Sequence, residues 1–245
     1  MQSEKTVELH PGLPEMPSRI AKLPVFRGYP VPFFVDYICK NPLHAEPNGN
    51  PVTHEVGSSC MSEPEFRAMD PRKFKRCYQE RLCWVCGEPL GKYLAFVIGP
   101  MCAVNRITSE LPNHRECAEW AVKACPFLSM PKARYRPGLP DGSQEPAGIC
   151  LDRNPGVAMI WITRTYSIFR AEHGNAGYLV DLGEPEEILA YCEGRKATHA
   201  EIMHSIDTGI PTLRQASIEH GEPDEAREAL DRKYAEVSAL VKAIA

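Results

Sequence analysis

The sequence lacks a long hydrophobic run. Its longest apolar stretch, from Tyr93 to Val104, is interrupted at Gly99-Pro100 and is shorter than the ~20 apolar residues that a membrane-spanning helix needs. The first seventeen residues are polar and proline-rich, without the basic start and apolar centre of a secretory signal. We therefore expect no membrane span and a cytoplasmic protein.

Motifs for nucleotide binding are also missing. The chain contains neither a P-loop nor the glycine fingerprint of a dinucleotide site. Its serines have no nucleophile-elbow context. Histidine is scarce in the middle of the chain, where His114 is the only one between Glu55 and Glu172. These absences argue against a nucleotide cofactor and leave few candidates for a general base.

What is present fits a globular protein. The 245 residues are 43% hydrophobic and 24% charged, and 23 prolines indicate many turns. Ten cysteines are present. In the cytosol we expect them to be thiols or metal ligands rather than disulfides.

The charge of −4 is unevenly distributed along the chain. Residues 1–66 carry a net −3, residues 67–136 carry +7, and residues 137–245 carry −8. A basic middle could attract phosphates, or its cations could pair with the acidic part of the same chain. The second interpretation is favoured.

Two cysteine and histidine pairs dominate the middle of the sequence. Cys83 and Cys86 are separated by two residues and followed by Gly87, a spacing that lets both thiolates reach one ion from a tight turn. After 27 further residues, His114 and Cys117 form a second pair. Residues three apart at the start of a helix share a face. Three thiolates and one imidazole predict a closed, structural Zn²⁺ site.

This arrangement resembles the treble-clef zinc finger, which has a knuckle, a β-hairpin and a helix whose first turn gives the last two ligands. The likeness covers about residues 80–128. The segments CWVCGEPLG, FVIGPMCAVNR, HRECA, CPFL and EGRKATHAEIMHSI also resemble a group of bacterial and phage proteins for which no activity is established. That resemblance implies no activity.

Other cysteines offer weaker candidates. Cys102 is the main rival to His114 as the fourth ligand. Cys39, His44, His54 and Cys60 could form a second metal site, but their spacing is irregular. The remaining cysteines are expected to be small buried groups.

We expect an α+β fold in four parts. Residues 1–66 form a short β-rich region, 67–136 the zinc-binding treble-clef module, 137–152 a linker, and 153–245 a mixed α/β region with a β-hairpin and helices. Within them we predict the following elements: strands at 31–39 and 93–99, a helix begun by Asp70-Pro71, a helix over 114–128, a pairing of 157–169 with 177–183, and helices from Pro185, from Thr198 to Gly209, from Pro211 to Gly221 and from Pro223.

Two enzyme hypotheses can be weighed. Treble-clef proteins include HNH-type nucleases, which need a general-base histidine and a catalytic magnesium. His114 is already used by the predicted zinc site, so the nuclease stays a minor alternative. A hydrolase with a site outside the zinc module is another, but the single Glu201-x2-His204 motif is better explained by a helix cap.

The function we predict is therefore binding of a macromolecule, without catalysis, by an intracellular zinc protein. Nucleic acid and protein partners are nearly equally favoured. Trp84, Tyr93, Trp120 and Tyr135 lie between the cations, as a nucleic-acid surface requires. The candidate nucleic-acid contacts are Arg72, Lys73, Arg76, Lys92, Arg106, Arg115, Arg134 and Arg136.

The last helix carries an apolar stripe that must pack against something. It is formed by Leu230, Tyr234, Val237, Val241 and Ile244. Packing within the chain is favoured, and a homodimer through this helix is the alternative.

Overall fold

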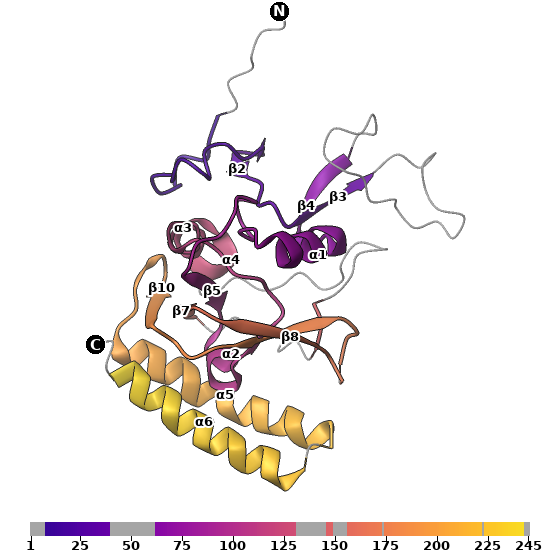
Figure 1. Cartoon of the computed structure of the whole chain (residues 1–245). Coiled ribbons are helices and arrows are strands. Elements are labelled where there is room, and N and C mark those ends of the chain that lie inside the picture. Colours follow the sequence, from indigo (N-terminus) through magenta and orange to yellow (C-terminus); the bar gives the residue numbers. More distant parts are fainter. Residues whose placement is uncertain are drawn as a thin grey trace, which may run out of the picture. The chain divides into compact units, whose positions relative to one another are not determined.

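The computed structural model describes residues 8–39, 62–130, 146–148, 156–172, 174–221 and 223–242. Over these residues the chain forms six helices and eleven short strands (Figure 1), which confirms the predicted α+β class. The described residues up to Pro89 form one compact unit, and those from Leu90 onward form a second. None of the helices in these ranges is both long and apolar enough to span a bilayer.

The first unit contains two antiparallel strand pairs. β1 (Val25–Phe26) and β2 (Tyr29–Pro30) are joined by Arg27-Gly28, both with positive φ. β3 (Val35–Cys39) pairs with β4 (Ser62–Met69). β3 confirms the second part of the strand predicted at 31–39.

The helix predicted after Asp70 is α1 (Pro71–Glu80). The Asp70 side chain accepts a hydrogen bond from Arg72 N at 2.8 Å, as an N-cap does. Phe74 and Cys77 are buried on its inner face. Tyr78 is 42% exposed and lies outside that face, although its spacing had placed it there.

The second unit contains two antiparallel sheets. One has the strand order β11-β10-β7-β5 and the other the order β6-β9-β8. The strands are β5 (Leu94–Ile98), β6 (Ile107–Thr108), β7 (Ala158–Thr163), β8 (Tyr166–Arg170), β9 (Tyr178–Leu182), β10 (Glu187–Cys192) and β11 (Arg195–Lys196). The pairing of β8 with β9 confirms the predicted hairpin with 177–183 for the second half of 157–169 only. The first half is β7, a separate strand that pairs with β5 and β10.

The helix predicted from Pro185 is wrong. This segment forms β10, which lies between β7 and β11. Ile188 and Ala190 alternate with less buried neighbours, and this period of two belongs to a strand rather than a helix. The two acidic residues near Pro185 favoured a helix start locally, but pairing with β7 prevailed.

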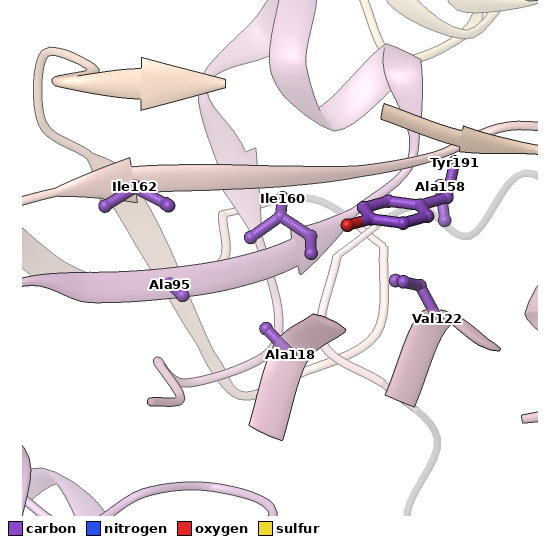
Figure 2. Close-up of a cluster of buried hydrophobic side chains, with 7 residues drawn as sticks. All are labelled: Ala95, Ala118, Val122, Ala158, Ile160, Ile162 and Tyr191. Atoms are coloured by element: carbon purple, nitrogen blue, oxygen red, sulfur yellow. The ribbon is translucent and has the colours of Figure 1, made fainter. Parts of the chain in front are cut away.

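The core of the second unit lies between α3 (Arg115–Ala124) and the sheet that contains β5, β7 and β10. Ala118 and Val122 of the helix face Ala95, Ile160 and the other buried side chains of this cluster (Figure 2). α3 confirms the first part of the helix predicted over 114–128, and the short helix α4 (Pro126–Ser129) follows it. The packing fixes the position of α3 and therefore of its first turn.

The remaining helices are α2 (Pro100–Asn105), α5 (His199–Glu219) and α6 (Asp224–Lys242). Thr198 is the N-cap of α5 and forms the predicted capping box with Glu201. The two helices predicted on either side of Gly209 are one helix, with Pro211 inside it. Proline removes only one main-chain hydrogen bond, and packing of α5 against α2 and α6 maintains the helix.

α5 and α6 lie side by side as an antiparallel pair (Figure 1). Leu230, Val237 and Val241 of the predicted stripe are buried, and α6 packs against α2 and α5. The described part of the stripe thus contributes to the core of its own unit.

Candidate metal centre

Cys83 and Cys86 lie in a tight turn that follows α1. Cys83 N donates to Glu88 O at 2.8 Å, and Gly87 N donates to Cys83 O at 2.8 Å. Cys86 N lies 3.4 Å from Cys83 Sγ, so one thiol accepts a main-chain N–H of the same turn. Gly87 has φ +72°, the left-handed conformation that favours glycine. The turn has the form of the predicted knuckle.

Aromatic side chains support this turn from within the first unit. Trp84 is 2% exposed and stacks on Phe34, with ring centroids 5.0 Å apart. The Phe74 ring of α1 meets it edge-on at 5.8 Å. Phe33 N donates to Val85 O at 2.8 Å. The knuckle is therefore anchored by packing and by main-chain hydrogen bonds.

His114 and Cys117 lie at the start of α3. His114 is the N-cap residue, and its side chain makes no capping hydrogen bond, so the imidazole is not used to satisfy the helix. Its Nδ1 lies 3.8 Å from Cys117 Sγ. Asn113 and Ala95 exchange two main-chain hydrogen bonds of 2.8 and 2.9 Å, which hold the residue before His114 against β5.

The two predicted pairs come together. One ligand atom from each of Cys83, Cys86, His114 and Cys117 lies within 4.8 Å of the others. The three cysteines are buried and the histidine is intermediate. In the described residues this is the only group of at least three His, Cys, Asp or Glu side chains placed so closely.

Four side chains placed this closely could together hold one metal ion. With Zn–S near ~2.3 Å and Zn–N near ~2.0 Å, neighbouring ligand atoms of a tetrahedron lie roughly 3.5–3.8 Å apart. The observed 3.8 Å between His114 Nδ1 and Cys117 Sγ is close to that range. Three thiols with one imidazole are ligands that Zn²⁺ prefers.

None of the other cysteines that the structure describes belongs to this group. Cys102, the rival of His114, lies in α2 and does not belong to it. Burial, with the charge of Cys83, raises the pKa of the Cys77 thiol to about 12, which makes it a neutral buried group. Cys39 is disulfide-bonded, so the expectation that all cysteines are thiols or ligands is wrong there. The rest of the second candidate set, His44, His54 and Cys60, lies outside the described residues.

The chain between the two ligand pairs differs from the expected β-hairpin. After β5 it forms α2 and β6 before reaching α3. β5 pairs with β7 rather than with a neighbouring strand of the module, and the single Ala95–Asn113 bridge replaces the second strand. The order of knuckle, strand and helix is present, but the hairpin is reduced to this bridge.

The candidate nucleic-acid cations of the first unit interact within that unit. Arg72 forms an ion pair with Asp70, and Arg76 forms one with Glu80. Lys73 Nζ donates to a main-chain carbonyl of β3 at 2.5 Å. Their charges are partly neutralised before any partner binds.

Two candidate cations of the second unit, Arg106 and Arg115, are paired with its acidic residues. Arg106, whose side chain is 18% exposed, contacts Glu184 and Glu236. Arg115 donates to the Glu187 carboxylate through both terminal guanidinium nitrogens, Nη1 at 2.8 Å and Nη2 at 2.7 Å. These carboxylates belong to the acidic last part of the chain, which supports the favoured interpretation of the charge pattern.

Of the aromatic candidates that the structure describes, only Tyr93 is exposed. Trp84 and Trp120 are buried, whereas Tyr93 is 53% exposed with Lys92 Nζ 5.8 Å from its ring centroid. Arg134, Tyr135 and Arg136 lie outside the described residues.

A charged group beside the knuckle was missed in the sequence. Glu88 contacts Arg19 and Lys22, which are 69 and 66 positions away. Spacing alone carries no signal for such a contact.

Comparison of the chain with protein families, curated proteins and solved structures gave no match.

Proposed function

We propose that the protein binds one zinc ion through Cys83, Cys86, His114 and Cys117, and that this ion stabilises its fold. The observation that carries the proposal is the convergence of the four ligand atoms within 4.8 Å of one another. Zinc is favoured over harder divalent ions because three of the four donors are sulfur.

The site is structural rather than catalytic. Four protein ligands complete a tetrahedral zinc shell and leave no position for a water molecule or substrate. The zinc would fix the knuckle relative to the first turn of α3. These parts together constitute a treble-clef-like module whose hairpin has been shortened to one bridge.

The function of this module is to bind a macromolecule without catalysis. Pairing of Arg106 and Arg115 with carboxylates of the same chain weakens the case for nucleic acid and favours a protein partner. Gel-shift titrations with mixed DNA and RNA test this choice. Nucleic acid retained at low salt and released steeply as salt rises would overturn the preference for protein.

The zinc site is tested by elemental analysis of purified protein. We expect one zinc per chain, and we expect Cys86→Ser to lose the metal and to unfold at a lower temperature because the shell is incomplete. Cys102→Ser is the matched control and should keep its zinc, since Cys102 lies outside the ligand group. Protein without a bound transition metal, or Cys86→Ser with full zinc content, would overturn the proposal.

An HNH-like nuclease is the alternative that the same module suggests. It requires His114 as a general base, and the zinc shell already uses this residue. Incubation of plasmid DNA with the protein and Mg²⁺ distinguishes the two functions. Cutting that His114→Ala abolishes while the zinc content stays unchanged would establish the nuclease.

A further inference from the structure

We propose that Glu88 is a positioning residue of the metal centre. Together with Arg19 and Lys22 it would fix an N-terminal turn, residues 17–23, against the knuckle and so hold Cys83 and Cys86 in the geometry that binds metal. This inference rests on the proposed zinc site. It adds that residues 17–23 help to hold the knuckle in place.

The main chain of Glu88 already belongs to the knuckle. Its carbonyl accepts the N–H of Cys83 at 2.8 Å, and the next residue, Pro89, forms a bridge with Leu82. The Glu88 side chain therefore extends from the residue that closes the cysteine-bearing turn. A force that fixes this side chain also restricts the turn.

The N-terminal turn presents two cations on one side. Ile20 N and Ala21 N both donate to Pro17 O, at 2.9 and 3.0 Å, so the backbone makes one helical turn there. Residues three apart in such a turn lie on the same face, which places Arg19 and Lys22 together. Ile20 between them is fully buried and anchors the turn in the first unit.

The Glu88 carboxylate uses both oxygens in this contact. Oε1 accepts from Lys22 Nζ at 3.0 Å, and Oε2 accepts from an Arg19 Nη. The Glu88 side chain is 29% exposed and that of Arg19 is 36% exposed, so neither is fully surrounded by solvent. Two cations on one carboxylate restrict it more than a single surface ion pair would.

This restriction bears on metal affinity because ligands must be held in place before they bind an ion strongly. Groups that orient metal ligands from behind contribute to affinity without touching the metal. A knuckle released from the turn would lose more conformational entropy when it binds zinc. The expected signature is weaker binding with an unchanged set of ligands.

The test is the isosteric variant Glu88→Gln, which removes the charge and keeps the side-chain shape. Competition with a chromophoric chelator should show zinc affinity reduced about three- to tenfold at low ionic strength. At ~1 M salt, parent and variant should converge because the ion pairs are screened. The thiolate-to-metal absorption of the Co²⁺-substituted variant should match that of the parent, since the ligands are the same.

Glu80→Gln is the matched control. Glu80 pairs with Arg76 on the exposed surface of α1, and neither residue belongs to the knuckle, so the zinc affinity of this variant should equal that of the parent. Equal affinity of Glu88→Gln and parent at low salt, or equal weakening in Glu80→Gln, would overturn the role of Glu88 and leave the zinc site standing. A parent protein that binds no metal would instead overturn the zinc site and this inference with it.

Discussion

Gly87 shows how a single residue supports the candidate metal site. It follows Cys86, has φ +72° and lies so close to Phe33 that an added Cβ would be 2.7 Å from the aromatic ring. Both the conformation and the space exclude a larger side chain. Glycine after a Cys-x2-Cys turn is thus required twice in this protein, once by the backbone and once by packing.

We expect Gly87→Ala to lower the free energy of unfolding by about 2–4 kcal/mol, from left-handed backbone strain and displacement of Phe33. Urea unfolding in zinc-containing buffer measures this loss, and zinc content should fall with it because the knuckle is distorted. Gly91→Ala is the control, since nothing lies within 4 Å of its added Cβ and its φ lies outside the left-handed region. It should differ from the parent by at most about 0.5 kcal/mol. Equal effects of the two substitutions would contradict this account of Gly87.

At this scale, the residues that could be predicted are those whose chemistry is encoded by short spacing. Two residues between Cys83 and Cys86, and two between His114 and Cys117, predict pairs that converge, and the structure brings them together. The capping box of Thr198 has the same local character. The contact of Arg19 with Glu88 depends on the fold alone, and no local pattern could have indicated it.

At the scale of elements, one buried aspartate lies in β3 and another is the N-cap of α1, and the pKa values of the two carboxyl groups shift in opposite directions. Asp36 and Asp70 are 3% and 2% exposed. Burial, together with the charge of Asp70, raises the pKa of Asp36 above its usual value of 3.8. Burial acts on Asp70 in the same direction, but hydrogen bonds from Arg72 lower its pKa below 3.8.

These directions predict opposite effects of two similar substitutions. Asp36→Asn should raise the free energy of unfolding at neutral pH, because the folded state disfavours the ionised carboxylate. The gain should disappear as pH falls through the raised folded pKa and the parent's carboxyl becomes protonated. Asp70→Asn should lower the free energy of unfolding by about 1 kcal/mol at neutral pH, since its charged hydrogen bonds to Arg72 are lost. This stabilisation is present above 3.8 and is lost as pH falls below it.

Urea unfolding of both variants and the parent at several pH values, from neutral to below 3.8, provides the measurement. Each aspartate serves as the control for the other, because the chemical change and the unit are the same. Shifts of the same sign in the two variants would contradict the assigned electrostatics.

Helices and strands were predictable where their signals lie in neighbouring residues. They were not predictable where pairing between strands distant in the sequence determines the structure. The aspartate and proline before α1 and the capping box before α5 gave correct starts. The segment that forms β10 was predicted to be a helix. Its pairing with β7, which is distant in the sequence, has no local signal. Glu193 and Gly194, both with positive φ, lie in the tight turn between β10 and β11, and this local hairpin signal was missed in the sequence.

At the scale of the whole molecule, acidic residues of the chain partly neutralise its own basic residues. The acidic last part of the sequence supplies Glu184, Glu187 and Glu236 to the arginines of the basic middle. Segment net charges therefore overstate the field that a partner would meet. The composition gave the sign of each segment but not this neutralisation, which requires β9, β10 and α6 to lie near Arg106 and Arg115.

The packing of the apolar stripe of α6 distinguishes a monomer from a homodimer. Val237 is 1% exposed and lies on a helix that packs against α2 and α5 of the same chain, so we expect a monomer of 27.4 kDa in light scattering. Val237→Ala should lower the free energy of unfolding by about 1–3 kcal/mol, through lost apolar contacts and a small cavity, without changing that mass. Ile218→Ala, at a position 54% exposed on α5, should leave both quantities nearly unchanged. If the stripe instead formed a homodimer interface, the melting temperature of the parent would rise with protein concentration. Val237→Ala would then lower the mass measured by light scattering.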